Sequence, residues 1–340
     1  MSKLAYLAAA AAVCAALVPA ARALARYFCL YDMPDSRKVH DRPTPLLGGA
    51  AIGVTFCALL ALRAAIARQP FDSPLLLGVP LIMAVGLADD VARLNVVQKL
   101  IGQAAVAFAV VCAGAGVALT GQPYLDFAIS AFWIITLVNV INFADNMNGL
   151  SAGIVAVLSG AFYFLSGSVA ALLAAGVCLG YLPYNFRRRA WIFMGDMGSM
   201  ALGLVLAVLT MRYVHRASDQ TLAAAAALVL LGYPLADAAL VVVSRVAHGR
   251  PFYVGGVDHV SHRLVRLGMG QRPAVVLLWA VNGLYGAAAV ALAKLGQRAL
   301  IPVVAGLGAL TLVALVALLR VPVYRPAEVV AQAEPETTGK

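Results

Sequence analysis

Residues 74–90 read PLLLGVPLIMAVGLADD, an apolar run that ends on two adjacent carboxylates, Asp89 and Asp90. Such a run is typical of a helix that crosses the hydrocarbon core of a bilayer, which is about 30 Å thick. Carboxylates where the helix leaves the bilayer are costly to desolvate, so they indicate chemistry at the membrane boundary. Because the two charges repel each other, they favour binding of a divalent metal or abstraction of a proton. The alternative is a solvated pair that ends the helix, with Arg93 as its ion-pair partner.

Apolar spans of this kind fill most of the chain. It has 340 residues, of which 63% are hydrophobic and 12% charged, and a soluble core cannot bury that much apolar surface. We therefore predict an all-α polytopic membrane protein with about eleven transmembrane helices, ten being the alternative. The predicted spans are residues 4–27, 46–67, 74–88, 96–119, 124–141, 150–166, 168–185, 199–214, 221–245, 274–293 and 299–320. We expect residues 1–323 to form a single membrane domain and residues 324–340 a short disordered cytoplasmic tail.

The positive charges predict how the chain lies in the membrane. With the N-terminus periplasmic and the C-terminus cytoplasmic, most of the 25 lysines and arginines fall in cytoplasmic segments. This distribution explains the net charge of +10 without a nucleic-acid partner. The orientation needs residues 4–27 as a retained first helix, whereas a cleavable signal peptide is the alternative. The five cysteines lie in or beside apolar segments without CxxC spacing, which indicates free thiols.

Four further polar islands fall on the same predicted side as the first. The richest reads NVINFADNMNGL over residues 139–150. Its amides and single carboxylate offer paired donors and acceptors that suit a nucleobase edge or a ribose. The alternative is a loop in which asparagine and glycine supply turn geometry and a helix cap. The candidate ligand contacts here are Asn142, Asp145 and Asn148.

Another island, GDMGS at residues 195–199, opens the predicted span 199–214. A glycine-flanked carboxylate before a helix, here Asp196, suits Mg²⁺ in a tight turn, and the helix N-terminus favours phosphate. The alternative is an ordinary helix N-cap. Lys99, on the predicted helix after the paired carboxylates Asp89 and Asp90, supplies a cation that is expected to face those two carboxylates.

The last two islands are basic, RKVH at residues 37–40 and DHVSHRL at residues 258–264. His259 and His262 are three residues apart and so face one side of a short helix. Two ligands are too few for a closed zinc site, so phosphate binding by the histidines and Arg263 is the more natural interpretation. The alternative is an amphipathic helix that lies at the membrane interface.

In this order the islands resemble the polyprenyl-phosphate N-acetylhexosamine-1-phosphate transferase family, to which phospho-MurNAc-pentapeptide translocase is related. The resemblance extends from about Tyr31 to Leu267. The motifs that carry it are DMPDSRKVH at 32–40, GLADD at 86–90, IFMGD at 192–196 and DHVSHRL at 258–264. Each motif alone is weak evidence, whereas all of them in order form a highly specific signal.

The resemblance implies a Mg²⁺-dependent transferase, with Mn²⁺ as an alternative metal. It would move a sugar-1-phosphate from a UDP-N-acetylhexosamine to undecaprenyl phosphate, giving an undecaprenyl-diphosphate-linked sugar and UMP. That reaction initiates cell-envelope glycans such as O-antigen. It implies a multi-pass protein of the bacterial inner membrane, within the lipid bilayer, whose active site lies on the cytoplasmic face. The sugar, the acceptor and the oligomeric state stay open, a homodimer included.

The resemblance also implies residue roles. Asp196 resembles the metal ligand, and Asp89, with Asp90 beside it, resembles the catalytic group that binds or deprotonates the lipid phosphate. The implied nucleotide-sugar contacts, among which Phe193 stacks on uracil, are Asn142, Asp145, Asn148, Asn185, Phe193, His259, His262 and Arg263. The implied lipid-phosphate contacts are Lys38, His40 and Lys99.

The chain departs from the family at three positions. Asn146 and Asn148 stand where many relatives carry Gly and Asp, and Val257 replaces a residue that is often basic. A transporter or flippase for an anionic lipid or solute is the main rival, because discontinuous helices and intramembrane charges also suit transport. The islands lie at one boundary, however, whereas transport sites lie near the midplane. An inactive scaffold is a third interpretation, and a CDP-alcohol phosphotransferase is disfavoured because the DGxxAR signature is absent.

Overall fold

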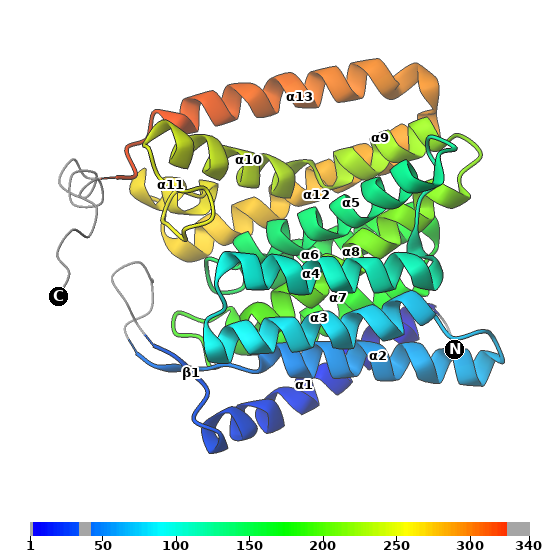
Figure 1. Cartoon of the computed structure of the whole chain (residues 1–340). Helices are drawn as coiled ribbons and strands as arrows, with labels where there is room; N and C mark the ends of the chain where they lie inside the picture. Colours follow the sequence, from blue (N-terminus) through cyan, green and yellow to red (C-terminus); the bar gives the residue numbers. More distant parts are fainter. Residues whose placement is uncertain (1–2, 34–41, 325–340) are drawn as a thin grey trace.

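The computed structural model describes residues 3–33 and 42–324, which form a bundle of long helices (Figure 1). The helices are α1 (Lys3–Tyr27), α2 (Gly48–Ala67), α3 (Ser73–Ala92), α4 (Val96–Val110), α5 (Pro123–Phe143), α6 (Leu150–Ser166), α7 (Val169–Asn185), α8 (Gly195–Arg216), α9 (Gln220–Leu230), α10 (Gly232–Ala247), α11 (Val260–Arg266), α12 (Gln271–Leu295) and α13 (Gln297–Leu319). Two short strands, β1 (Tyr31–Asp32) and β2 (Thr44–Pro45), pair antiparallel between α1 and α2.

The predicted all-α polytopic architecture is confirmed. Within the described residues, eight helices are long and apolar enough to cross a membrane, and α9 with α10 makes a ninth span if the bent pair is one crossing. The helices α6 and α7 are apolar but shorter. All eleven predicted spans therefore correspond to helical segments, whereas the number that crosses the bilayer stays a prediction.

Two predicted spans are interrupted. The span predicted at 221–245 bends by 63° between α9 and α10. Pro234 lies in the first turn of α10, where a proline ring clashes with the carbonyl four residues before it, so the helix cannot run straight through. The span predicted at 96–119 leaves regular α-helix at Val110 and ends in a π-helical turn, η1 (Val111–Ala115), in which Gly114 has a positive φ.

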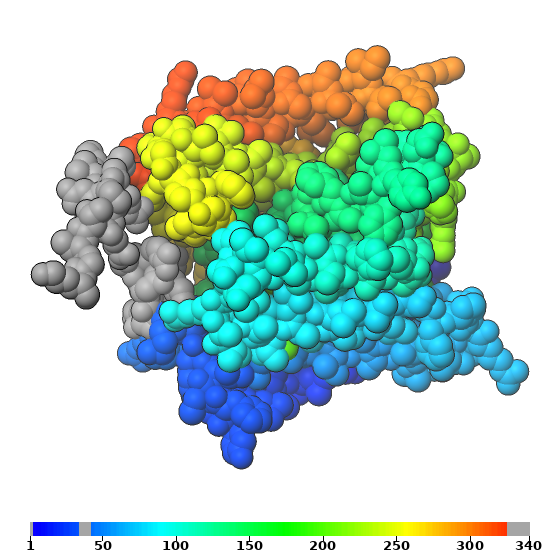
Figure 2. Space-filling view, viewed as in Figure 1, coloured from blue at the N-terminus to red at the C-terminus, as the bar shows by residue number. Residues whose placement is uncertain are grey.

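Helix α8 is the centre of the bundle. Of its most apolar stretch, 89% is buried, against 6% for α13, which runs along the outer edge of the molecule (Figure 2). Glycines on α8 and its neighbours let the helix backbones approach closely, as packing within a bilayer favours. A Cβ on Gly86 of α3 would lie 2.5 Å from the Met197 nitrogen of α8, so this crossing accepts no larger side chain.

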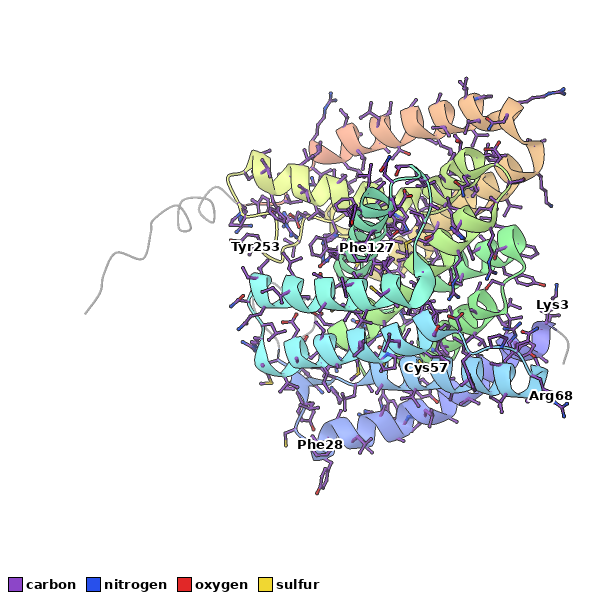
Figure 3. All side chains as sticks on the ribbon, turned by 45° about the vertical axis from the view of Figure 1, so that its right-hand side comes forward. Lys3, Phe28, Cys57, Arg68, Phe127 and Tyr253 are labelled. Carbon is purple, nitrogen blue, oxygen red and sulfur yellow. The ribbon has the colours of Figure 1, made fainter. Side chains whose placement is uncertain are left out.

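The helix ends define the two faces of the bundle. Lys3 and Arg68 lie at one end, Phe28 and Tyr253 at the other, and Cys57 and Phe127 between them (Figure 3). The end that carries Phe28 and Tyr253 is where α3, α5 and α7 finish and where α4 and α8 begin (Figure 1). The polar islands that the structure describes therefore meet at one end of the bundle.

Candidate active site

A cavity of about 1170 Å³ opens at this end of the bundle. Its wall combines seven arginines with five aspartates: Arg22, Arg42, Arg93, Arg187, Arg188, Arg189 and Arg272, and Asp32, Asp89, Asp90, Asp145 and Asp196. The volume is ample for a nucleotide-sized ligand, since pockets for small molecules measure about 300–1,000 Å³. The mixture of both charges suits a ligand that carries phosphate groups and needs a cation to bridge them.

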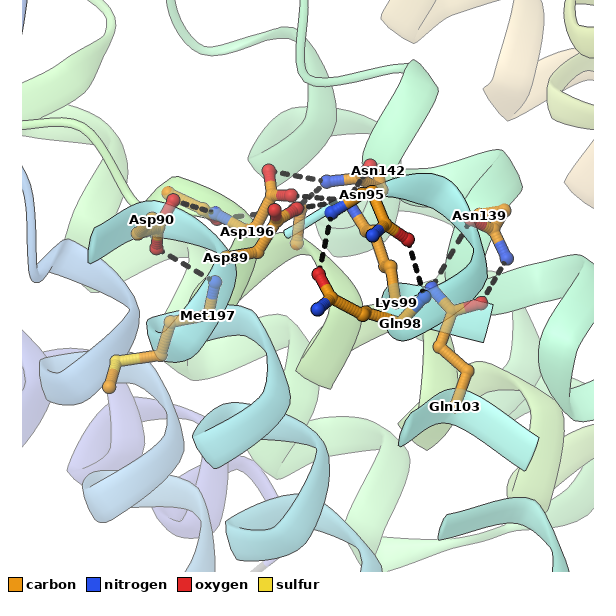
Figure 4. A network of polar contacts seen from close by, with 12 residues as sticks. Asp89, Asp90, Asn95, Gln98, Lys99, Gln103, Asn139, Asn142, Asp196 and Met197 are labelled. Atoms are coloured by element: carbon orange, nitrogen blue, oxygen red, sulfur yellow. Dashed lines mark hydrogen bonds and ion pairs between the residues drawn. The ribbon is translucent and has the colours of Figure 1, made fainter. Parts of the chain in front are cut away.

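The most concentrated charge lies where α3, α4 and α8 meet. The ammonium of Lys99 lies 2.7 Å from Asp89 Oδ2 and also pairs with Asp196 (Figure 4). Asn142 of α5 donates from Nδ2 to Asp196 Oδ1 at 2.8 Å and to Ser199 Oγ at 3.0 Å. One cation thus serves two half-buried carboxylates that are more than one hundred residues apart in the sequence.

Asp90 has a different environment from its neighbour. Its two carboxylate oxygens accept from the backbone N–H groups of Asp196 at 2.9 Å and Met197 at 3.2 Å, at the start of α8. The N–H groups at a helix N-terminus carry partial positive charge, so they offset part of the cost of burying this carboxylate beside Asp89 and Asp196. Gly195 has a φ of +68°, and a Cβ on it would lie 2.4 Å from Asp90 Oδ2. Asp90 therefore binds the α8 N-terminus and also lines the cavity, and its catalytic role stays a prediction.

The donor set around Lys99 suits one type of metal site. In the described ranges no group of three or more His, Cys, Asp or Glu side chains is arranged to hold an ion. Mg²⁺ does not require such a cage, because it is commonly held by one or two carboxylates together with substrate phosphates. Asp89 and Asp196, which already share a cation, and the amide oxygen of Asn142 fit a Mg²⁺ that arrives with a diphosphate.

Asp145 lines the cavity without a bonding partner among the described side chains. Burial, together with the negative charges of Asp196 and Asp90, raises the pKa of its carboxyl group to about 8. An acid in this state is available to a ligand that offers hydrogen-bond donors or acceptors, as a nucleoside does. The predicted position of Asp145 on a ligand surface therefore agrees with the geometry.

The asparagines of the predicted nucleotide site are more engaged. Asn148 donates to the Arg187 carbonyl at 3.0 Å, a bond that an aspartate at this position would not make at neutral pH. Asn185, 4% exposed, accepts from Gly149 N at 2.6 Å and donates to the Ile192 carbonyl at 3.0 Å. Both side chains reach the cavity wall while they fix the loops beside it.

The histidine loop contributes fewer contacts than predicted. His262 lines the cavity, and burial together with the nearby His259 lowers its pKa to about 4, so its imidazole is neutral near pH 7. His259 is 4% exposed and its Nδ1 lies 2.8 Å from Asp237 Oδ2 of α10. Arg263 is 1% exposed. Neither His259 nor Arg263 is part of the cavity wall, in contrast to their predicted roles as substrate contacts.

The remaining predicted residues divide in two groups. Phe193 is in the cavity wall, whereas Lys38 and His40 lie outside the described residues. The sequence also missed cavity residues, among them Arg22, whose guanidinium carbon lies 4.1 Å from the centre of the Trp191 ring. Its position near the end of the predicted span 4–27 is the sequence signal that could have found it.

Comparison with known proteins identifies the family. Residues 73–214 match the model of glycosyl transferase family 4. The chain is 32% identical over 346 residues to the decaprenyl-phosphate N-acetylglucosaminephosphotransferase of Mycolicibacterium smegmatis, covering 88% of this chain and 84% of that protein.

Two further relatives carry similar names. A probable undecaprenyl-phosphate N-acetylglucosaminyl 1-phosphate transferase of Bacillus subtilis is 27% identical, with 81% of each chain covered. The undecaprenyl-phosphate alpha-N-acetylglucosaminyl 1-phosphate transferase of Yersinia pestis is 26% identical over 76% of this chain and 75% of that protein. With its motifs, its helical membrane fold and these relatives, the chain belongs to glycosyl transferase family 4, within the polyprenyl-phosphate N-acetylhexosamine-1-phosphate transferases.

Proposed function

We propose that this protein transfers N-acetylhexosamine-1-phosphate from a UDP-linked donor to a polyprenyl phosphate, undecaprenyl phosphate being the expected acceptor. An oxygen of the lipid phosphate attacks the β-phosphorus of the donor, and the bond from that phosphorus to the oxygen bridging the two phosphates breaks. UMP leaves with that oxygen, and the lipid keeps the new diphosphate-linked sugar. The observation that carries the proposal is the convergence of Asp89 and Asp196, joined by Lys99, on the wall of one charged cavity at the end of the helical bundle.

The chemistry demands neutralisation of charge more than a strong base. The second pKa of a phosphate group is about 6, so the lipid phosphate is largely ionised near pH 7. Bringing it to a diphosphate collects several negative charges, which positioning and nearby cations must offset. Lys99 supplies one such cation, and Asp89 and Asp196 would hold Mg²⁺, which when bound would polarise the diphosphate.

The rest of the cavity wall matches the parts of the two substrates. Asp145 and Phe193 offer a polar edge and an aromatic face for the uracil ring, and His262 offers a neutral imidazole beside the phosphates. The arginines of the wall suit phosphate oxygens, because a guanidinium binds them through two parallel hydrogen bonds. Because the cavity lies at one end of the helical bundle, the acceptor lipid would keep its chain in the bilayer while its phosphate enters the site.

We place this site on the cytoplasmic face of a bacterial inner membrane, with the N-terminus outside and eleven crossings. The arginine-rich cavity wall supports this orientation, because positively charged loops are retained in the cytoplasm. Residues 1–323 then form one catalytic membrane domain, and the product starts a cell-envelope glycan. The comparisons give no support to the transporter alternative.

Release of UMP is the direct test. Purified protein in detergent with a short polyprenyl phosphate and Mg²⁺ is given a panel of UDP-N-acetylhexosamines, and free UMP is measured. We expect UMP to form from at least one donor only when acceptor and divalent metal are both present. Movement of a solute across proteoliposomes without release of UMP from any donor would contradict the proposal and favour a transporter.

A further inference from the structure

Arg263 makes four hydrogen bonds to other parts of the protein. Its Nε donates to the Asp258 carbonyl at 2.9 Å and its Nη2 to Ser244 Oγ at 2.7 Å. Its Nη1 donates to two backbone carbonyls, those of Leu318 at 2.8 Å and Val321 at 2.9 Å. A guanidinium has five N–H groups, so these four bonds leave little capacity for a substrate.

The two carbonyls on Nη1 belong to the terminal segment, residues 318–324, where α13 ends. Arg266 binds the same segment through the carbonyls of Pro322 at 2.9 Å and Val323 at 2.7 Å. Val323 is 2% exposed, and the hydroxyl of Tyr324 donates to Asp258 Oδ2. The terminal segment is therefore fastened to α11 and to the loop before it.

The loop itself is anchored on its other side by α10. Asp258 is fully buried and accepts two hydrogen bonds from Arg245, at 2.7 and 2.9 Å. Burial alone would raise the pKa of Asp258, but the bonds from Arg245 and Tyr324 hold it below its ordinary value. Because Arg245 satisfies this carboxylate, Arg263 is not needed as its charge partner. Arg263 instead donates to uncharged oxygens of separate segments and so holds these segments together. This link is called the tie below.

The residue that this tie controls is His262, which directly precedes Arg263 on α11 and lines the cavity. We propose that Arg263 is a positioning residue: it joins the terminal segment to α11 and so fixes His262 at the cavity wall, without touching the substrate. The inference rests on the proposed transferase function for its kinetic part. Its structural part, the tie between two segments 55 or more residues apart, is testable without any activity.

Arg263→Lys separates positioning from phosphate contact. Lysine keeps the positive charge, but its single ammonium cannot reproduce the planar set of donors that reaches four oxygens. We expect kcat for UMP release to fall on the order of 10- to 100-fold, the scale of a small misplacement of a reacting group. The KM for the UDP donor is expected to change by less than about twofold, because Arg263 itself makes no contact with the donor. A rise in donor KM with kcat unchanged would overturn the proposal.

Hydrogen–deuterium exchange gives the readout that does not depend on turnover. Arg263→Lys should increase amide exchange in residues 256–266 and, at the same time, in residues 318–324. Tyr324→Phe, which removes one bond from the terminal segment to the same loop, should increase exchange in both stretches to a smaller degree. It also serves as the second variant if Arg263→Lys does not purify as a monodisperse protein. Unchanged exchange in the terminal segment in both variants would refute the tie.

Arg320→Gln is the matched control. Arg320 is an exposed arginine within the terminal segment, directly after the last residue of α13, and among the described residues no side-chain hydrogen bond ties it to α11. The substitution should leave both exchange and kcat at wild-type values. If the wild-type protein itself released no UMP, the proposed function would fail, whereas the exchange experiment would still decide whether Arg263 ties the two segments.

Discussion

Asp89 and Asp90 are adjacent in sequence, yet their side chains have different partners. Successive residues on an α-helix are about 100° apart, so only one of two neighbours faces a given helix. Asp89 meets Lys99 of α4, whereas Asp90 meets the first amides of α8. The sequence predicted that both lie at a membrane boundary. It does not show how α3 is rotated about its axis relative to α4 and α8, and this rotation gives the two carboxylates different partners.

Asparagine variants of the two carboxylates that share Lys99 test the catalytic centre. Asp89→Asn and Asp196→Asn each remove a negative charge that a metal and an ammonium need, so we expect kcat for UMP release to fall at least about 100-fold, as for the loss of one preorganised charge-stabilising group. The variants should still elute as folded protein in detergent, because the amide keeps the volume. Wild-type turnover by Asp196→Asn would contradict the metal assignment.

Asp145 gives a prediction about pH and stability. Its folded pKa of about 8 lies above the ordinary carboxyl value of 3.8, so the folded state holds its proton more tightly than the unfolded state does. Asp145 therefore lowers the free energy of unfolding. This destabilisation is absent below pH 4, where the group is protonated in both states, and it grows as the pH rises toward 8. Asp145→Asn should raise the melting temperature in detergent by more at pH 8 than at pH 5. An equal shift at both values would mean that Asp145 ionises normally.

At the scale of elements, the site lies where the C-terminal ends of α3 and α5 contact the N-terminal ends of α4 and α8. The sequence located these ends because apolar runs and Gly breaks mark them, and all eleven predicted spans are helical. The sequence did not predict the bend between α9 and α10. Proline is common in the first turn of an undistorted helix, so Pro234 alone does not indicate a bend. The histidine spacing showed one helix face but not what covers it, so the contacts of His259 with Asp237 and of Arg263 with Leu318 were not predicted.

Glycine variants test the close crossing of α3 and α8. Gly86→Ala would place a Cβ against the backbone of α8, 2.5 Å from Met197 N, and push Asp90 away from the amides that it binds. We expect a loss of stability of about 1–3 kcal/mol, typical of overpacking, and loss of most UMP release. Gly160→Ala on α6 is the control, since nothing lies within 4 Å of its added Cβ. Equal effects of both variants would argue against a specific role for the crossing.

At the scale of the whole molecule, the bundle has a charged end with a cavity and an opposite end that holds Arg68 and the turn between α6 and α7. The proposed orientation predicts which end faces the cytoplasm. A cysteine placed at Gln69 should react with a membrane-impermeant thiol reagent on intact cells, whereas one at Leu267 should react only after permeabilisation. Gel-shift labelling, with the wild-type chain as the background, measures this difference. The reverse pattern would place the cavity outside and exclude a cytosolic nucleotide donor.

Lys99 has a consequence for the protein when divalent ions are scarce. Its ammonium neutralises part of the negative charge of Asp89 and Asp196, so these two carboxylates remain close together without a metal ion from solution. Chelation is then expected to halt turnover while leaving the helices packed and the melting temperature nearly constant. Cells would thus regain full catalytic capacity as soon as magnesium returned, with no need to synthesise the enzyme anew.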